Sequence, residues 1–374
     1  MLDAPQEQAP AASTFARVSL LVYGLLIVYA SWYPFAGWYV SGQGPFDYLL
    51  APLPYYWTKF DLFTNILAYM PFGALMVFAL YPRIRRAPAV LLATGAGIAI
   101  SAVMEAVQTY LPTRVPSNLD LMTNSAGILL GALAGLALTR TFLRESRFLQ
   151  LRQRWFSQDA GRGLMVVGLW PLAQVYPQSY LFGHGQIMPI LSEWMSDWLV
   201  TPIDLGALMR DSVELTVEQY WLSETIITAC GLNGAVLTLL CLLRPKAPKP
   251  ALTLTLIVAT IAAKSLTTAL LFTPENAFAW LTPGAQGGIL LGLVMLSGML
   301  LAPKLAQRRV AALMLLMSLV VVNIAPANPY FIATLQTWVQ GKFLNFNGAA
   351  QFLSLAWPFI ALWFLWHPAH RAKQ

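Results

Sequence analysis

The segment between residues 104 and 124, MEAVQTYLPTRVPSNLDLMTN, places polar side chains between two long apolar runs. Glu105 and Gln108 lie three residues apart, Arg114 follows, and Asp120 and Asn124 lie four residues apart. Residues at these spacings share one face of a helix. A carboxylate can act as a base, and the planar fork of an arginine can bind a phosphate. The segment therefore has the residue types of a ligand site.

The composition of the chain predicts a membrane protein. Of its 374 residues, 57% are hydrophobic and 10% are charged, whereas a soluble protein is about 25% charged. A spanning helix needs roughly 20 apolar residues. We expect an all-α, polytopic transmembrane bundle of about ten spanning helices, near residues 15–37, 61–81, 88–110, 118–139, 162–182, 217–243, 251–272, 282–302, 309–326 and 349–366.

The lysines and arginines predict how the chain is oriented. Most of them lie at alternate ends of the predicted spans, on the same side as Arg17. Basic loops stay in the cytoplasm, so we expect both termini there. The bulky sequence after the first apolar run is not a signal-peptide cleavage site, so the first helix is expected to be retained.

The predicted spans fall into two groups. We expect a four-helix membrane domain over residues 1–140, a basic cytoplasmic linker over 141–161 and a six-helix membrane domain over 162–374. Near residues 190–200, Trp194 and Trp198 lie four apart on an amphipathic pattern. This pattern predicts a helix on the outer membrane surface, and a lid over an outer site is the alternative.

With this orientation, the polar residues of the first domain fall near the outer leaflet. The ends of three helices can bring them together as a ligand-binding cluster of Asp61, Asn65, Glu105, Gln108, Arg114, Asp120 and Asn124. Small residues four apart allow close helix packing, and a proline frees a carbonyl that favours a packed face. The residues expected to pack the helices are Pro71, Gly73, Gly127 and Gly131.

A purely structural role is an open alternative for the same cluster. Asp61 and Asp120 stand near the starts of predicted helices, where they fit N-cap roles. Three carboxylates facing one arginine also leave negative charge in excess. Either one carboxyl is protonated, or a cationic group completes the site.

Several classes of function have no support in the sequence. No basic patch is interleaved with aromatic residues, so nucleic acid is not an expected partner. Cys230 and Cys241 lie in one apolar run, and the histidines, His184, His367 and His370, form no metal-ligand spacing. We expect no metal and no cofactor, and we find no recognisable catalytic constellation.

Lys264 is the exception in the second domain, because it lies in the middle of an apolar run, TIAAKSLTTALL. A charge at this depth is expensive unless it is paired. We expect Lys264 to pair with Glu218 or Glu224 of the preceding span, and a transport site is the alternative.

The first domain resembles the VanZ-like family of bacterial membrane proteins, over roughly residues 15 to 140. The family pattern is an acidic residue, Asn and Pro-x-Gly, then Glu-x-x-Gln, a loop Arg and Asp-x-x-x-Asn-x-x-Gly-x-x-x-Gly. The matching residues are Asp61, Asn65, Pro71, Gly73, Glu105, Gln108, Arg114, Asp120, Asn124, Gly127 and Gly131. The resemblance implies a multi-pass envelope protein of the bacterial inner membrane, of a family associated with teicoplanin resistance.

These observations leave three hypotheses for the function. The first is binding of a membrane lipid, such as a polyprenyl-phosphate carrier or cell-wall precursor, with a modulating effect on glycopeptide susceptibility. The second is an enzyme acting on polyprenyl-phosphate lipids, with Glu105 or Asp120 as general base. The third is a transporter that uses Lys264.

Overall fold

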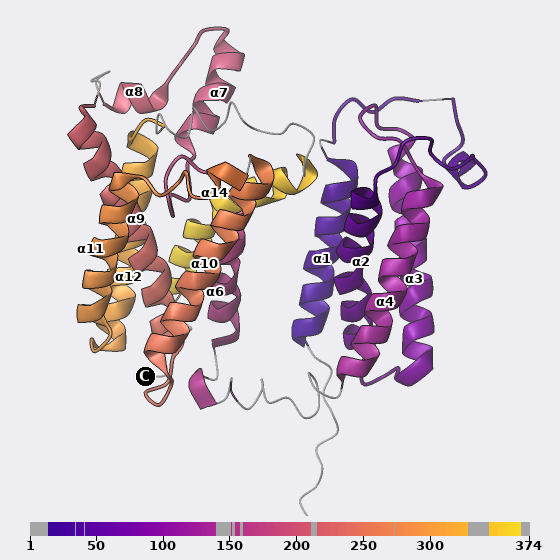
Figure 1. The fold of residues 1–374 in the computed structure, drawn as a ribbon, viewed down its shortest axis with the longest axis horizontal. Helices are drawn as coiled ribbons and strands as arrows, with labels where there is room; N and C mark the ends of the chain where they lie inside the picture. The colour runs from indigo at the N-terminus through magenta and orange to yellow at the C-terminus, as the bar shows by residue number, and fades with distance from the viewer. Residues whose placement is uncertain are drawn as a thin grey trace, which may run out of the picture. The chain divides into compact units, whose positions relative to one another are not determined.

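A computed structural model describes most of the chain (Figure 1). The described residues are 14–33, 35–40, 42–139, 151, 154–157, 160–210, 215–272, 274–327 and 344–367. Their regular secondary structure is helical, with short 3-10 turns and no β-strand among the described residues. The predicted all-α fold is therefore confirmed, and the side of the membrane on which the termini lie stays a prediction.

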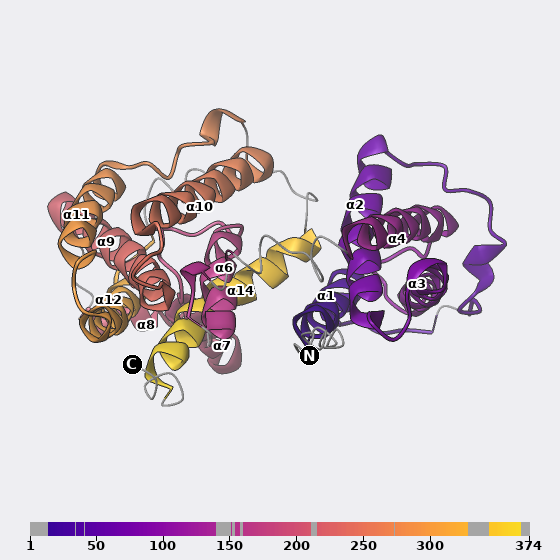
Figure 2. The same cartoon turned by 90° about the horizontal axis from the view of Figure 1, so that it is seen from below.

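The first unit is formed by four helices packed side by side. Contacts divide the chain into Met1–Gln150 and Leu151–Gln374. The first unit holds α1 (Thr14–Trp32), α2 (Lys59–Leu80), α3 (Arg86–Gln108) and α4 (Asn118–Thr139), with a 3-10 turn, η1, at Asp47–Leu49. Figure 2 shows the helices of this unit from below.

Glycines hold α2 and α4 together at backbone contact. A Cβ added to Gly131 would lie 1.9 Å from the carbonyl oxygen of Met70. One added to Gly127 would lie 2.4 Å from the carbonyl oxygen of Ile66, and one added to Gly73 would lie 2.1 Å from that of Ile128. No side chain fits at such distances. The contact between α2 and α4 therefore depends on the absence of side chains at these glycines.

Pro71 differs from the expectation, because it is not a packing residue. Its ring is exposed while Gly73, two residues later, is buried against α4. The two positions lie on different faces of α2, which stays helical through the proline. A carbonyl freed by Pro71 therefore does not mark the packed face.

The lengths of the helices agree with a membrane-spanning protein. Seven of the described helices are long and apolar enough to cross a membrane: α2, α3, α4, α9 (Val217–Leu242), α10 (Lys249–Leu271), α12 (Lys304–Ile324) and α14 (Leu344–Trp366). Three shorter apolar helices, α1, α6 (Ala160–Ala173) and α11 (Pro283–Met299), complete the ten predicted positions. Large apolar side chains such as Leu254 and Leu290 are uncovered by protein, which suits contact with lipid.

Helix α9 forms the centre of the second unit. It packs against α11 and α12 and also contacts α6, α10 and α14 (Figure 2). Most of its side chains are buried, as expected for a helix that is apolar all round. On the other side of the core, the Trp357 indole of α14 donates to the carbonyl of Val166 in α6.

The fifth predicted span, 162–182, is wrong in its second half. Helix α6 ends at Ala173, just after Pro171, and the chain continues to Ile187 as irregular backbone. This stretch is largely buried: the hydroxyl of Thr228 in α9 donates to the Leu181 carbonyl. Irregular backbone is stable at membrane depth only where protein covers it.

Two shorter helices, α7 (Met188–Leu199) and α8 (Leu205–Met209), follow the irregular stretch (Figure 1). Trp194 and Trp198 of α7 are 67% and 82% exposed. The location of α7 on the outer membrane surface stays a prediction. Most of the basic linker predicted at 141–161 lies outside the described residues.

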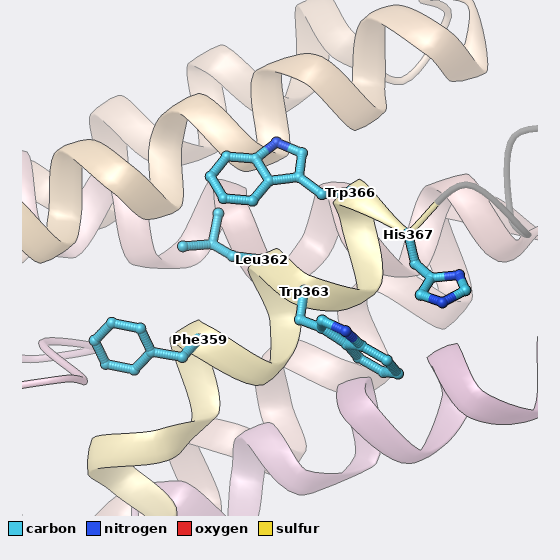
Figure 3. Close-up of a pocket in the computed structure, with 5 residues that line it drawn as sticks. All are labelled: Phe359, Leu362, Trp363, Trp366 and His367. Carbon is cyan, nitrogen blue, oxygen red and sulfur yellow. The ribbon is translucent and has the colours of Figure 1, made fainter.

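A shallow groove lies along α14 near its C-terminal end (Figure 3). It is lined by Phe359, Leu362, Trp363, Trp366 and His367. Its aromatic walls are half exposed, and His367 stacks edge-on against Trp363 at 5.2 Å between ring centroids. Nothing in this lining except His367 is ionisable, so the groove resembles lipid-facing surface more than a chemical site.

Candidate functional site

Polar side chains of the first unit gather where α1 and α3 end and α2 and α4 begin. We name this set the polar layer; its members are Asp61, Asn65, Ser101, Glu105, Gln108, Arg114, Ser117, Asp120 and Asn124. Glu105 is buried, and its carboxylate accepts a hydrogen bond from the backbone N–H of Ser117 at 3.0 Å. Ser117 directly precedes α4, and its own hydroxyl accepts from the Asp120 N–H. Glu105 of α3 therefore fixes the start of α4.

The layer also joins α4 to α2 and to α3. The Asn65 amide of α2 donates to the Asp120 carboxylate at 2.9 Å. One turn further along α4, the amide of Asn124 donates to the Ser101 hydroxyl of α3 at 3.0 Å. These bonds bring together the helix faces that the three- and four-residue spacings predict.

Gln108 and Arg114 bind the end of α1. The Gln108 amide donates to the Ser31 carbonyl at 3.3 Å. The Nη2 of Arg114 donates to the carbonyls of Ala30 and Tyr33, at 3.3 and 3.0 Å. The last carbonyls of a helix have no partner within the helix, so Arg114 supplies their missing donor.

Asp61 lies at the margin of the polar layer. Its side chain is exposed and accepts from the backbone N–H and the hydroxyl of Thr58, which caps α2. Asp61 is thus the third helical residue of a capping box rather than the N-cap expected from the sequence. Asp120 likewise is not the cap of α4, since it follows Ser117 by three residues.

The charges of the layer are close enough to act on one another. The charges of Asp120 and Arg114 both act on the buried carboxyl group of Glu105. Burial lowers the pKa of the Arg114 guanidinium and the nearby Glu105 raises it; an arginine keeps its proton in either case. Glu105 and Asp120 are thus two acidic groups near a single guanidinium.

Two polar atoms of the layer are buried and have no hydrogen-bond partner among the described residues. They are the Nε of Arg114 and the Oδ1 of Asn124. Buried polar groups in native proteins nearly all have a partner, and an arginine carries five donors in a rigid fork. The layer can therefore fasten helix ends and still offer Arg114 donors and an Asn124 acceptor to a ligand.

The second predicted charge cluster, Lys264 with Glu218 and Glu224, is not brought together. Lys264 of α10 is 3% exposed, and no described residue forms an ion pair or side-chain hydrogen bond with its ammonium. Glu218 is exposed in the first turn of α9. Glu224 is buried and accepts from the Thr282 hydroxyl, which precedes α11. The expected partner of Lys264 is therefore engaged elsewhere.

Family comparison agrees with the resemblance seen in the sequence. The family model described as VanZ/LLP1 matches residues 16–139. This segment is a VanZ-like domain. The matched segment contains nearly all of α1, the whole of α2, α3 and α4, and every member of the polar layer, so the candidate site lies within the VanZ-like domain. No curated protein and no solved structure matches the chain.

The prediction of the site missed one important residue of the VanZ-like domain. Ser117 links Glu105 to the start of α4, and its signal is the Ser-x-x-Asp pattern of Ser117 and Asp120 before an apolar run. The same pattern occurs at Thr58 and Asp61. No group of three potential metal ligands lies together among the residues with described positions.

Proposed function

We propose that the VanZ-like domain binds the anionic headgroup of a membrane lipid in its polar layer. The ligand class is a polyprenyl phosphate or a related lipid-linked cell-wall precursor. The basic-residue pattern predicts that the layer lies near the outer leaflet, and the VanZ-like resemblance implies that the membrane is a bacterial inner membrane. Retention of such a lipid would alter the supply of the target of glycopeptides, which fits the association of the VanZ-like family with teicoplanin.

The observation that carries this proposal is the incomplete bonding of Arg114. Its Nη2 donates to two carbonyls at the end of α1, while its Nε is buried and has no partner in the part of the chain that the structure describes. Guanidinium binds phosphate oxygens with short, charge-assisted hydrogen bonds. A phosphate beside Arg114 would accept hydrogen bonds from the guanidinium N–H groups that have no acceptor in the described protein.

The buried acids support recognition of a headgroup with hydroxyl groups. Glu105 and Asp120 are held in place by Ser117 and Asn65. A carboxylate has about four acceptor positions, so each can accept further bonds from a sugar or a protonated phosphate. Their negative charge would also discriminate against anions that bring no donor of their own.

The test compares lipid binding by three variants of the full chain in detergent. Polyprenyl phosphate is titrated and bound lipid is counted by native mass spectrometry. Arg114→Ala should weaken binding by at least about tenfold, the equivalent of one lost charged hydrogen bond of about 1.4 kcal/mol. Arg114→Lys should retain part of the affinity.

Lys59→Ala is the matched control, because Lys59 is an exposed cation at the start of α2. Its binding should equal that of the unchanged protein. Equal losses in Lys59→Ala and Arg114→Ala would mean general surface attraction and would contradict a site. Undiminished binding in a folded Arg114→Ala protein would leave Arg114 only its role at the end of α1.

A further inference from the structure

The loop that joins α1 to α2 in the VanZ-like domain exposes many large apolar side chains. Over residues 35–57 this loop, the α1–α2 loop, holds eight aromatic residues and a single charged one, Asp47. Leu50 is 95% exposed, and Tyr55 and Tyr56 are each 88% exposed. An exposed apolar patch of this kind marks a surface that binds a protein or a membrane.

The α1–α2 loop is fastened to the helices beside it. Tyr48, in the short turn η1, is buried, and its hydroxyl donates to the Ala102 carbonyl of α3 at 3.1 Å. Further along the loop, the Ala51 carbonyl accepts from the side-chain amide of Asn118, the first residue of α4, at 2.6 Å. The exposed apolar side chains therefore belong to a segment that is held in place by α3 and α4.

The loop lies against the side of α3 and does not only cover its end. Ala102 precedes the end of α3 at Gln108 by six residues, which is about 9 Å at 1.5 Å per residue. Figure 1 and Figure 2 both show η1 outside the group of four helices, beside α3. Val103, next to Ala102, is 48% exposed on the surface of this spanning helix. The loop is thus continuous with surface that meets lipid.

The chemistry of the loop fits the headgroup region of a membrane. Tyrosine and tryptophan favour this region, because each combines an apolar ring with a polar group. The carboxylate of Asp47 already accepts from the N–H of Gly44 at 2.6 Å. Irregular backbone is not tolerated in contact with acyl chains, because its polar groups find no partners there. The headgroup region supplies such partners, and water would leave the apolar side chains uncovered.

We propose that the α1–α2 loop is an interfacial anchor, which lies along α3 in the lipid headgroup region with its exposed apolar side chains among the lipids. Its partner is the lipid surface and not a soluble protein. Because the loop is bonded to α3 and to the start of α4, it also fixes the depth of the polar layer in the membrane. This inference does not depend on which ligand the polar layer binds.

The experiment measures the depth of single labelled positions in the full chain, reconstituted in lipid nanodiscs. Leu50→Cys and Tyr55→Cys each carry a fluorophore that is quenched by bromine or by iodide. The lipids bear bromine either near the headgroup or near the methyl end of the acyl chain, and iodide is added in the water. The unchanged protein, whose Cys230 is buried and whose Cys241 is half-buried, gives the labelling background.

Both labels should lose more emission to bromine near the headgroup than to bromine near the methyl end. Lys246→Cys is the control, because Lys246 is an exposed lysine in the turn before α10. Its label should lose emission mainly to iodide, and the labels at Leu50 and Tyr55 should lose less to iodide than this control does. Both loop residues are exposed, so neither substitution disturbs packing; if one variant does not fold, the other decides.

Two results would overturn the proposal. The first is a loss of emission to iodide equal to that of the Lys246→Cys control, with none to bromine, which would place the loop in water, where a soluble partner could reach it. The second is a larger loss to bromine near the methyl end, which would place the loop among the acyl chains.

Discussion

The polar layer of the VanZ-like domain and the buried polar side chains around His184 and Lys264 lie in different units and differ in how far their hydrogen bonds are completed. In the first, Glu105, Asn65 and Gln108 are each bonded to a neighbouring helix or helix end. In the second, the Trp170 indole N–H and the Oε1 atoms of Gln174 and Gln178 have no hydrogen-bond partner among the described residues. This difference shows that the burial of polar groups does not by itself identify a ligand site.

Completed bonds explain stability, and incomplete bonds indicate where a ligand binds. In the polar layer, the candidate ligand contacts are the few atoms left over, above all Nε of Arg114. Around His184 and Lys264 the leftover atoms include both a donor and acceptors, whereas His184 is bonded to both neighbouring amides. The following predictions test this contrast, from the largest expected effect to the smallest.

Gly131→Ala should have the largest effect, because it separates the two helices that the Asn65–Asp120 bond joins. The new Cβ would lie 1.9 Å from the Met70 carbonyl oxygen, which is backbone and cannot move alone. We expect the free energy of unfolding to fall by about 3 kcal/mol, the upper part of the range for overpacking. Denaturant titration in detergent measures this change.

Gly95→Ala in α3 is the control, because a Cβ there meets nothing within 4 Å. It should leave the free energy of unfolding unchanged or raise it slightly, since alanine favours a helix. Equal effects of the two substitutions would contradict the close contact of α2 and α4.

Glu105→Ala should lower the free energy of unfolding by about 1–3 kcal/mol, the cost of leaving a buried donor without an acceptor. The donor is the Ser117 N–H at the start of α4. Glu105→Gln keeps an acceptor oxygen and should lose less. Both are measured by the same titration, and an equal loss in the two variants would mean that the charge of Glu105 matters more than the bond.

Lys264→Met should act in the opposite direction. Replacing a buried ionic group by an apolar one is often neutral or stabilising by about 1–4 kcal/mol, and we expect the lower end of this range. A clear loss of stability in Lys264→Met would show that Lys264 has a partner in the protein and would remove the contrast.

Asn65→Ala should have the smallest effect, about 0.5–1.5 kcal/mol, because its bond to Asp120 is only partly buried. A double-mutant cycle with Asp120→Ala isolates the contribution of the pair. A coupling energy near zero would mean that the two side chains do not hold α2 to α4.

Much of this fold could be predicted from the sequence, because spanning helices need long apolar runs. The spacings of Glu105 with Gln108 and of Asp120 with Asn124 predicted which helix faces meet. The early end of α6 could not be predicted, since a buried irregular segment has the same apolar composition as a helix.

The hydrogen-bond partner of each side chain was harder to predict than the face of the helix on which the side chain lies. Lys264 and Glu224 are both buried, yet Glu224 is bonded to Thr282 of another helix. Sequence spacing gives the face of a helix but does not say which neighbour covers it. Pro71 and Gly73 show the same limit, because only one of these close positions faces α4.

The most direct test of the central claim compares two lipids that differ only in the headgroup. Polyprenyl phosphate and the corresponding polyprenol are titrated into the full chain, and bound lipid is measured by native mass spectrometry. We expect the phosphate to bind at least about tenfold more tightly, a difference of about 1.4 kcal/mol, and the advantage to vanish in Arg114→Ala. Equal binding of the phosphate and the alcohol by the unchanged protein would contradict the claim that the polar layer receives an anionic headgroup.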